Sequence, residues 1–491
     1  MIIREMIHTG KERLPGVLGF TLFGSYIAVA AFVTASSPVI GMALFCLPLL
    51  LLLTFYRTDV IFILFFLVLP FDKLGKIFPA DTAYLGTLTI AKVFLLVVIL
   101  AFVAKVLIFK ADRSIQVGAS NPLTLILVGF VLVSVLSLAN AENRVASVFY
   151  LLQRFNLLVL FVVSINIIRD EHLLHRILLA TLIGYVGVAL VGIYEFATGE
   201  GVLISIWGEG VGQAKELANI IHQKGVRIRG FTGDPDFHGV SMVLPTMIAL
   251  MMTMSGRSRI SKVTMMVLCG LFVFNILATG SRGAALSVIS ATLVFFLFSR
   301  FPRKFLMTGL ILAILGGFYV FSRMEATPLP MERFVGESGL SSIQYRVGWA
   351  QMAFEMIRDH PFIGVGTGNF PFAYHRYLNP RVPPDPMWTH NSFLQVWAEN
   401  GFLAFLLYVC SYVLAGRNFL LVYRRTPNEA FKVRVLALFA TLCGYVLFAC
   451  TSNAVGNEYY WILFAFSLAA LVIENRMQTG EGQRRIAIRV N

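Results

Sequence analysis

The stretch that decides the fold is PLTLILVGFVLVSVLSLAN, residues 122–140. It carries no charged side chain, and its length is about the 20 residues that an α-helix needs to cross a bilayer. The whole chain shares this character: of its 491 residues 57% are hydrophobic and 13% are charged, and the mean hydropathy is +0.78. This composition excludes an ordinary soluble protein. We therefore predict an all-α polytopic membrane protein.

Apolar runs of this kind predict about 12–14 transmembrane helices, the range arising because the run 59–70 is short and could be re-entrant with its neighbour. No cleavable signal peptide is expected, because the first apolar run is continued by further spans. The five cysteines lie inside apolar runs without metal-ligand spacing, so we expect neither a disulfide framework nor a metal site. The predicted spans lie near residues 16–35, 38–56, 59–70, 88–109, 122–140, 146–168, 174–197, 237–255, 261–279, 283–300, 304–322, 401–422, 434–452 and 456–474.

The formal net charge of +14 first suggests the positive-inside rule in such a protein, and nucleic acid is not an expected partner. With the N-terminus in the cytoplasm, every second connection becomes cytoplasmic and is rich in lysine and arginine. The short connections on the outer side carry few cations. This alternation predicts a cytoplasmic C-terminal tail and an outer location for two long segments, residues 198–236 and 323–400.

These two outer segments are also basic, which the positive-inside rule does not explain. An anionic partner on the outer face would explain their charges, and so would simple solvation of long loops, and composition leaves both readings open. We divide the chain into N-terminal transmembrane helices (1–200), central transmembrane helices with the first outer loop (201–322), a large extracytoplasmic loop (323–400), and C-terminal transmembrane helices with a cytoplasmic tail (401–491).

Short helices are expected in the large loop. The spacing of apolar residues predicts a helix over 343–358 that could lie on the bilayer with its apolar side down. The glycine-rich turn GVGTGNF (364–370) lacks a preceding strand and a following Lys-Ser/Thr, so it does not indicate a nucleotide site.

Three polar residues at or near the predicted membrane boundary allow both a structural and a functional reading. Arg282 begins a span, where an arginine can snorkel to the headgroups or bind an anion. Arg154 lies about two turns inside a span, where charges usually face a cavity or a partner, and its structural partner could be Glu195. His390 ends the large loop and could be a capping or interfacial residue or a catalytic base.

Four segments in order, across roughly residues 220–415, resemble the O-antigen ligase and O-antigen polymerase superfamily of bacterial envelope glycosyltransferases. They are RIRGFTGDPDFHG (227–239), GSRGA (280–284), YRVGWAQMAFEMIRDHPFIGVGTGNF (345–370) and HNSFLQ (390–395). One departure is Asp236, where the family often has asparagine. The matching positions are Arg227, Gly230, Asp234, Pro235 and Asp236, then Ser281, Arg282 and Gly283, then Arg346, Trp349, His360 and Pro361, and finally His390, Asn391 and Leu394.

The resemblance implies a GT-C-like membrane enzyme that transfers glycan from undecaprenyl diphosphate without a metal ion or other cofactor. It implies a bacterial inner-membrane location, an active site facing the exterior, and a glycan, lipid or protein acceptor. Arginine suits a diphosphate because its planar fork binds phosphate oxygens and stays charged, and a histidine can take the proton of the acceptor hydroxyl. The expected catalytic residues are His390, Arg282 and Arg346, and the expected substrate-binding residues are Arg227, Asn391, Asp234, Trp349 and Arg154.

Two rival classes of function were weighed against this one. A transporter of a small anion or of a lipid-linked glycan would be expected to show two related halves with broken helices, and no internal repeat is visible. A non-catalytic scaffold would give no reason for His390, Arg282 and Arg346 to converge. Within the superfamily, the sequence does not separate ligase from polymerase.

The topology predicts the reactivity of single introduced cysteines. In a cysteine-free background, cysteines replacing Lys215 and Arg376 are expected to react with a membrane-impermeant thiol reagent in intact cells, because both positions lie in outer loops. A cysteine replacing Arg485 is expected to react only after permeabilisation. Labelling at position 485 in sealed cells would contradict the topology.

Overall fold

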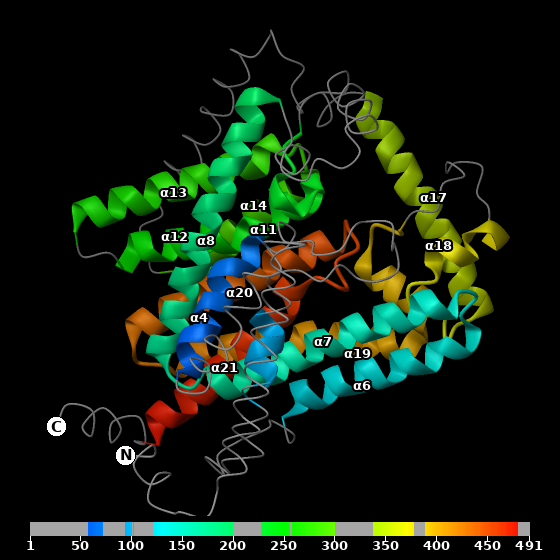
Figure 1. Cartoon of the computed structure of the whole chain (residues 1–491), viewed down its shortest axis with the longest axis horizontal. Helices are drawn as coiled ribbons and strands as arrows, with labels where there is room; N and C mark the ends of the chain where they lie inside the picture. Colours follow the sequence, from blue (N-terminus) through cyan, green and yellow to red (C-terminus); the bar gives the residue numbers. More distant parts are fainter. Residues whose placement is uncertain are drawn as a thin grey trace, which may run out of the picture. The chain divides into compact units, whose positions relative to one another are not determined.

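The structure, a computed structural model, describes residues 57–71, 94–100, 102, 121–199, 227–255, 258–299, 337–377 and 388–479. Within these residues every element of regular secondary structure is an α-helix or a 3-10 helix (Figure 1). The all-α prediction is confirmed.

Eight helices in the described part of the chain are long and apolar enough to cross a membrane, which confirms the polytopic prediction. Two shorter apolar helices are α4 (Thr58–Val68) and α14 (Arg282–Phe298). The eight are α6 (Pro122–Leu136) continued by η2 (Ser137–Asn140), α7 (Arg144–Ile167), α8 (Glu171–Thr198), α11 (Pro235–Ser241) with α12 (Val243–Ser255), α13 (Arg259–Ala278), α19 (Ser392–Arg425), α20 (Glu429–Ala449) and α21 (Glu458–Gln478).

The predicted total of transmembrane helices stays a prediction. The spans expected at 16–35, 38–56 and 304–322, and most of the one at 88–109, lie outside the described residues. The chain divides into two compact units, Met1–Ile61 with Leu96–Ala111 and Phe62–Leu95 with Asp112–Asn491. All features discussed below belong to the second unit.

Small residues bring α11, α14 and α20 close together. Gly444 of α20 lies against the carbonyl of Ser287 in α14, where a side chain would not fit. A Cβ on Gly239 of α11 would meet the Cβ of Ala284 at 2.7 Å. Because van der Waals packing is the main attraction between helices in lipid, such close approaches hold α11 on the first turn of α14.

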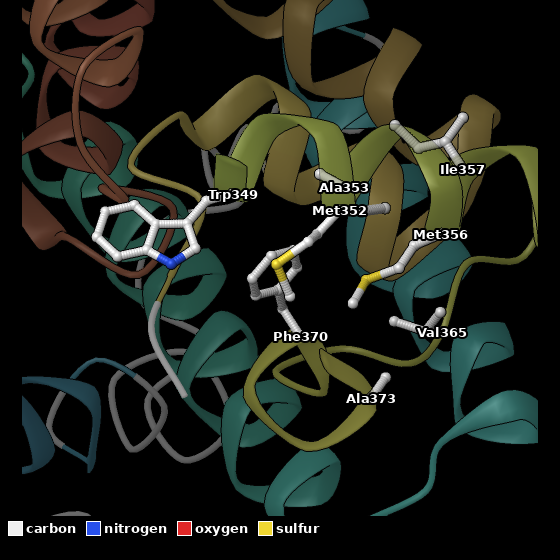
Figure 2. Close-up of a cluster of buried hydrophobic side chains, with 9 residues drawn as sticks. Trp349, Met352, Ala353, Met356, Ile357, Val365, Phe370 and Ala373 are labelled. Atoms are coloured by element: carbon white, nitrogen blue, oxygen red, sulfur yellow. The ribbon is translucent and has the colours of Figure 1, made fainter. Parts of the chain in front are cut away.

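The helix α17 (Glu337–Asp359) is the main element of the large loop and covers the expected range 343–358. Its apolar face packs on the protein itself, against Phe370, Val365 and Ala373 from the following turn and α18 (Phe370–Ala373) and against Ala398 of α19 (Figure 2). The expectation that this face lies on the bilayer is therefore wrong. The reason is that the turn supplies a second apolar surface, which the periodicity of one helix does not reveal. The hydrophobic side chains of α17 buried in this cluster are Trp349, Met352, Ala353, Met356 and Ile357.

The glycine-rich turn after α17 docks on α19 through backbone hydrogen bonds. Val365 N donates to Ala398 O at 2.9 Å and Phe402 N donates to Pro361 O at 2.8 Å. The helix α19 is broken at Gly401, whose φ of 80° is open mainly to glycine. At Gly364, with a φ of 75°, a Cβ would collide with the backbone of Glu399. The turn and the first part of α19 therefore form one rigid corner.

This corner predicts unequal effects of two glycine substitutions. Gly364→Ala and Gly233→Ala both force a left-handed backbone on alanine, which costs about 1–2 kcal/mol. Only Gly364 also faces a backbone collision, because nothing lies within 4 Å of the Cβ position at Gly233. Overpacking adds about 1–3 kcal/mol. Thermal unfolding in detergent should therefore give a clearly lower midpoint for Gly364→Ala, and equal midpoints would contradict the tight corner.

Candidate active site

The four motif segments form two packed groups that are linked by electrostatic interactions among Asp236, Arg346 and His390. The first segment forms η3 (Gly230–Thr232) and α11, the second starts α14, the third is α17 with its turn, and the fourth leads into α19. α11 packs on η3 and α14, and α17 packs on α19. The structure thus gathers residues that are far apart in sequence.

His390 has a strained backbone and a stacked ring. Its φ of 52° makes it the only non-glycine residue with positive φ among the described residues. Its imidazole packs on the indole of Trp349, with ring centroids 4.9 Å apart and an interplanar angle of 32°. Nδ1 of His390 and Nε1 of Trp349 are both buried without a hydrogen-bond partner in the described structure. Buried polar atoms normally have partners, so this pair of atoms is suited to a bound ligand.

The surroundings of His390 favour the neutral imidazole. Burial lowers its pKa below the ordinary value, and the positive charge of Arg346 lowers it further. The carboxylates of Asp236 and Asp234 act in the opposite direction, but more weakly. A neutral imidazole near pH 7 has a free lone pair and can accept a proton.

The backbone next to His390 is held by hydrogen bonds between Thr389 and the first turns of α19. The backbone N and the Oγ1 of Thr389 donate to Oε1 of Gln395 at 3.3 and 3.0 Å. Nε2 of Gln395 in turn donates to Oε1 of Glu399 at 2.7 Å. The strained backbone of His390 therefore rests on a buried hydrogen-bond chain, as expected for a residue whose geometry matters.

Asn391 caps α19. Its Oδ1 accepts hydrogen bonds from the backbone N–H groups of Phe393 and Leu394, each at 3.0 Å. The sequence analysis expects Asn391 to bind substrate. The structure gives its oxygen the role of a helix cap, which fixes the residue that follows His390.

Two of the four expected arginines have no partner among the described residues. Neither Arg282, at the first position of α14, nor Arg346, on α17, has a hydrogen bond or ion pair with any described residue. They lie within electrostatic reach of each other, since burial and then the charge of Arg282 lower the pKa of the Arg346 guanidinium, while Asp236 raises it. Arg227 is engaged: its Nε donates to Thr279 O at 2.6 Å, and a terminal nitrogen donates to Asp236 Oδ1 at 3.0 Å.

The two aspartates of GDPDFHG have different roles. Asp234 caps α11, since its Oδ1 accepts from the backbone N–H groups of Asp236 and Phe237 at 2.7 and 3.2 Å. Asp236 binds Arg227 and acts electrostatically on Arg346 and His390. The sequence analysis chose Asp234 as the substrate-binding acid, whereas Asp236 is the acid that faces the basic residues.

Arg154 lies apart from this cluster. Its side chain is buried, and its guanidinium donates to Ser134 Oγ at 2.7 Å and to Asn400 Oδ1 at 2.9 Å. The acid whose charge acts on it is Glu399, so the expected pair with Glu195 is wrong. Glu195 instead accepts hydrogen bonds from backbone N–H groups of residues 229 and 230 at 2.9 and 2.7 Å. The structure thus gives Arg154 a place in a buried polar network inside the helix bundle.

The glycine-rich turn binds an anion of the chain itself. The backbone N–H groups of Gly368 and Phe370 donate to the two carboxylate oxygens of Glu399 at 2.8 and 3.2 Å. Internal satisfaction of these donors agrees with the rejection of a nucleotide loop. Within the described ranges, no group of three or more His, Cys, Asp or Glu side chains could hold a metal ion.

Comparisons with known proteins bear on this geometry. Residues 265–409 match the family model described as O-antigen ligase. This range contains Arg282, Arg346, Trp349 and His390. The resemblance to the O-antigen ligase superfamily is confirmed.

A curated relative supports the same superfamily. It is an O-antigen ligase of Salmonella typhimurium, 27% identical over 222 residues, an alignment that covers 43% of this chain and 54% of the relative. The chain is thus matched over about half the length of this O-antigen ligase. The several apolar helices and the O-antigen ligase match together indicate a multi-pass protein of the bacterial inner membrane.

Sequence reasoning missed three residues that shape the site. Asp236 was matched to the family pattern, with a departure from asparagine, but was not chosen as a site residue, and Gln395 and Glu399 were not chosen either. The signal available was that Glu399 is an acid inside an apolar run, where a charge is costly and calls for a partner. Its hydrogen-bond partners are the side-chain amide of Gln395 and two backbone N–H groups of the glycine-rich turn, and backbone donors leave no trace in a sequence.

Proposed function

We propose that the chain is a membrane glycosyltransferase of the O-antigen ligase type. It moves glycan from an undecaprenyl-diphosphate-linked donor to an acceptor hydroxyl on the outer face of the cytoplasmic membrane. The observation that carries the proposal is that Arg346 lies within electrostatic reach of both Arg282 and the strained His390, and that neither arginine has a hydrogen bond or ion pair among the described residues. The family match supports glycan transfer by a membrane enzyme. The donor, the acceptor and the outward orientation are the proposed part.

The arginines are suited to the diphosphate of the donor. Arg282 and Arg346 would bind its oxygens with their planar forks, and Arg227, held by Asp236, would stand beside them. When the bond between the anomeric carbon and the diphosphate oxygen breaks, the electron pair stays on the diphosphate. Fixed positive charges then stabilise the transition state more than the ground state, and this supplies the role that a metal ion has in other transferases.

His390 is suited to act on the acceptor. The acceptor oxygen attacks the anomeric carbon, its proton moves to the imidazole, and undecaprenyl diphosphate leaves. A substrate hydroxyl would also provide partners for the two buried atoms that lack them, Nδ1 of His390 and Nε1 of Trp349. The indole of Trp349 holds the imidazole from one side, which leaves it little freedom to turn.

Turnover by purified protein tests the proposal against a transporter. A purified transferase releases undecaprenyl diphosphate from a lipid-linked glycan in detergent, where no transport is possible. A deletion strain then separates the two transferase types, because products with a single repeat unit indicate a lost polymerase, and unattached long polymer indicates a lost ligase.

The bidentate role of Arg282 predicts a strong effect of a conservative change. Arg282→Lys keeps the charge but loses the fork, so transfer is expected to fall at least tenfold, about the value of one lost charge-assisted hydrogen bond. The matched control is Arg358→Lys, which alters an exposed arginine paired only with Asp359 and should retain activity. Near-normal transfer by Arg282→Lys would favour simple snorkelling.

The proposed role of His390 as the general base predicts both a loss of rate in its alanine variant and a pH dependence of the wild-type rate. His390→Ala is expected to lower kcat by about a hundred- to ten-thousand-fold, with donor binding nearly unchanged, because the arginines hold the diphosphate. In the wild type the rate should fall as the pH drops through the pKa of His390, which lies below its ordinary value. His375→Ala, at an exposed histidine beside Glu142, is the control. A His390→Ala rate above a tenth of wild type, with chemistry limiting, would place the base elsewhere.

A further inference from the structure

We propose that Asp236 is the internal counter-ion of the arginine cluster: it holds Arg227 in place and competes with the diphosphate for the positive charges of the site. The inference rests on the proposed diphosphate-binding role of the arginines. It assigns a function to the position at which this chain has aspartate while the superfamily often has asparagine.

The first argument is the direct contact between Asp236 and Arg227. Oδ1 of Asp236 accepts from the guanidinium at 3.0 Å, and the two side chains are only 27% and 20% exposed. The Nε of the same guanidinium donates to Thr279 O at 2.6 Å. Arg227 therefore connects α11 with the loop that leads directly into Arg282. The contact with Asp236 fixes the orientation of its guanidinium.

The second argument is the place of Asp236 on α11. Asp236 and Gly239 lie three residues apart, on one side of the helix, and Gly239 is packed on Ala284 in the first turn of α14. Asp236 therefore lies toward the helix end that carries Arg282. Asp234 is committed to its cap, so Asp236 is the carboxylate of this segment that remains for the basic residues.

The third argument is the balance of charge around the base. His390 is influenced by Arg346 of α17 and by Asp236 and Asp234 of α11. Arg346 itself is repelled by Arg282 and attracted by Asp236. Among the described residues, Asp236 is thus the acid that binds Arg227, attracts Arg346 and also makes His390 more basic.

A carboxylate in this position has a physical use. Three fixed guanidiniums would bind the leaving undecaprenyl diphosphate tightly, and binding that is equal in ground state and transition state adds nothing to turnover. A nearby negative charge weakens the binding of substrate and product alike. Asp236 is thereby expected to reduce affinity and to speed product release.

The variant Asp236→Asn tests this inference because it removes the charge and keeps an oxygen that can accept from Arg227. The probe is inorganic diphosphate, titrated into purified protein in detergent by calorimetry. Asp236→Asn is expected to bind the probe about three- to tenfold more tightly than wild type, since one like charge is removed from a partly screened site. Asp236→Ala, which also releases Arg227, is expected to bind less tightly than Asp236→Asn. Asp359→Asn makes the same change of net charge at the exposed end of α17 and should bind as wild type does.

A second readout separates the charge effect from a merely structural one. Asp236 raises the pKa of His390, so its neutralisation should move the acid limb of the pH–rate profile to lower pH. Diphosphate binding by Asp236→Asn that is unchanged or weaker, or an unmoved acid limb, would overturn the inference. Absence of diphosphate binding in the wild type would overturn it together with the arginine site. Tighter binding by the variant without any glycan transfer by the wild type would sink the proposed function alone.

Discussion

The hydrogen bonding of the buried Glu399 carboxylate is the interaction on which the packing of α17, the glycine-rich turn and the start of α19 depends. An ionised carboxylate inside a helix bundle is costly unless hydrogen bonds and an opposite charge compensate for it. Here Gly368 N, Phe370 N and the amide of Gln395 donate to it at 2.7–3.2 Å, and Arg154 supplies the opposite charge. Each of these partners belongs to a different element, so satisfying one charge fixes several segments at once.

The Glu399 carboxylate supports the candidate site in two ways. On one side the glycine-rich turn is held against α19, and the turn gives α17 the apolar surface on which Trp349 and its neighbours pack. On the other side Gln395 carries the support to Thr389, next to His390. The ring contact between Trp349 and His390 joins these two sets of contacts, because Trp349 belongs to α17 and His390 follows Thr389. A strained histidine persists in such a place because its surroundings over-determine it.

The charges of the site come from a separate part of the bundle. α11 and the first turn of α14 are held together by small residues and carry Asp236 and Arg282, and Arg227 lies in the segment before η3. α17 brings Arg346 to them from the large loop. His390 thus lies on one set of elements and most of the cations on another, an arrangement that agrees with the proposed transfer between a lipid-linked donor and an acceptor.

The class of fold could be predicted from the sequence because long apolar runs leave the backbone no alternative to helices in a bilayer. The resemblance to the O-antigen ligase superfamily also followed from local motifs, and the same motifs led us to expect His390, Arg282, Arg346 and Arg227 as site residues. The sequence did not reveal that Asp234 caps a helix while its neighbour Asp236 binds an arginine. Nor did it reveal that the charge acting on Arg154 is that of Glu399, 245 positions away by their numbering, and not that of Glu195.

Helix periodicity and composition depend on residues that are close together along the chain. The sequence by itself therefore determined the helices, their membrane-spanning character and the motifs. The partners of a buried charge and the surface beneath an amphipathic helix are set by elements distant in sequence, and only the tertiary structure decided them.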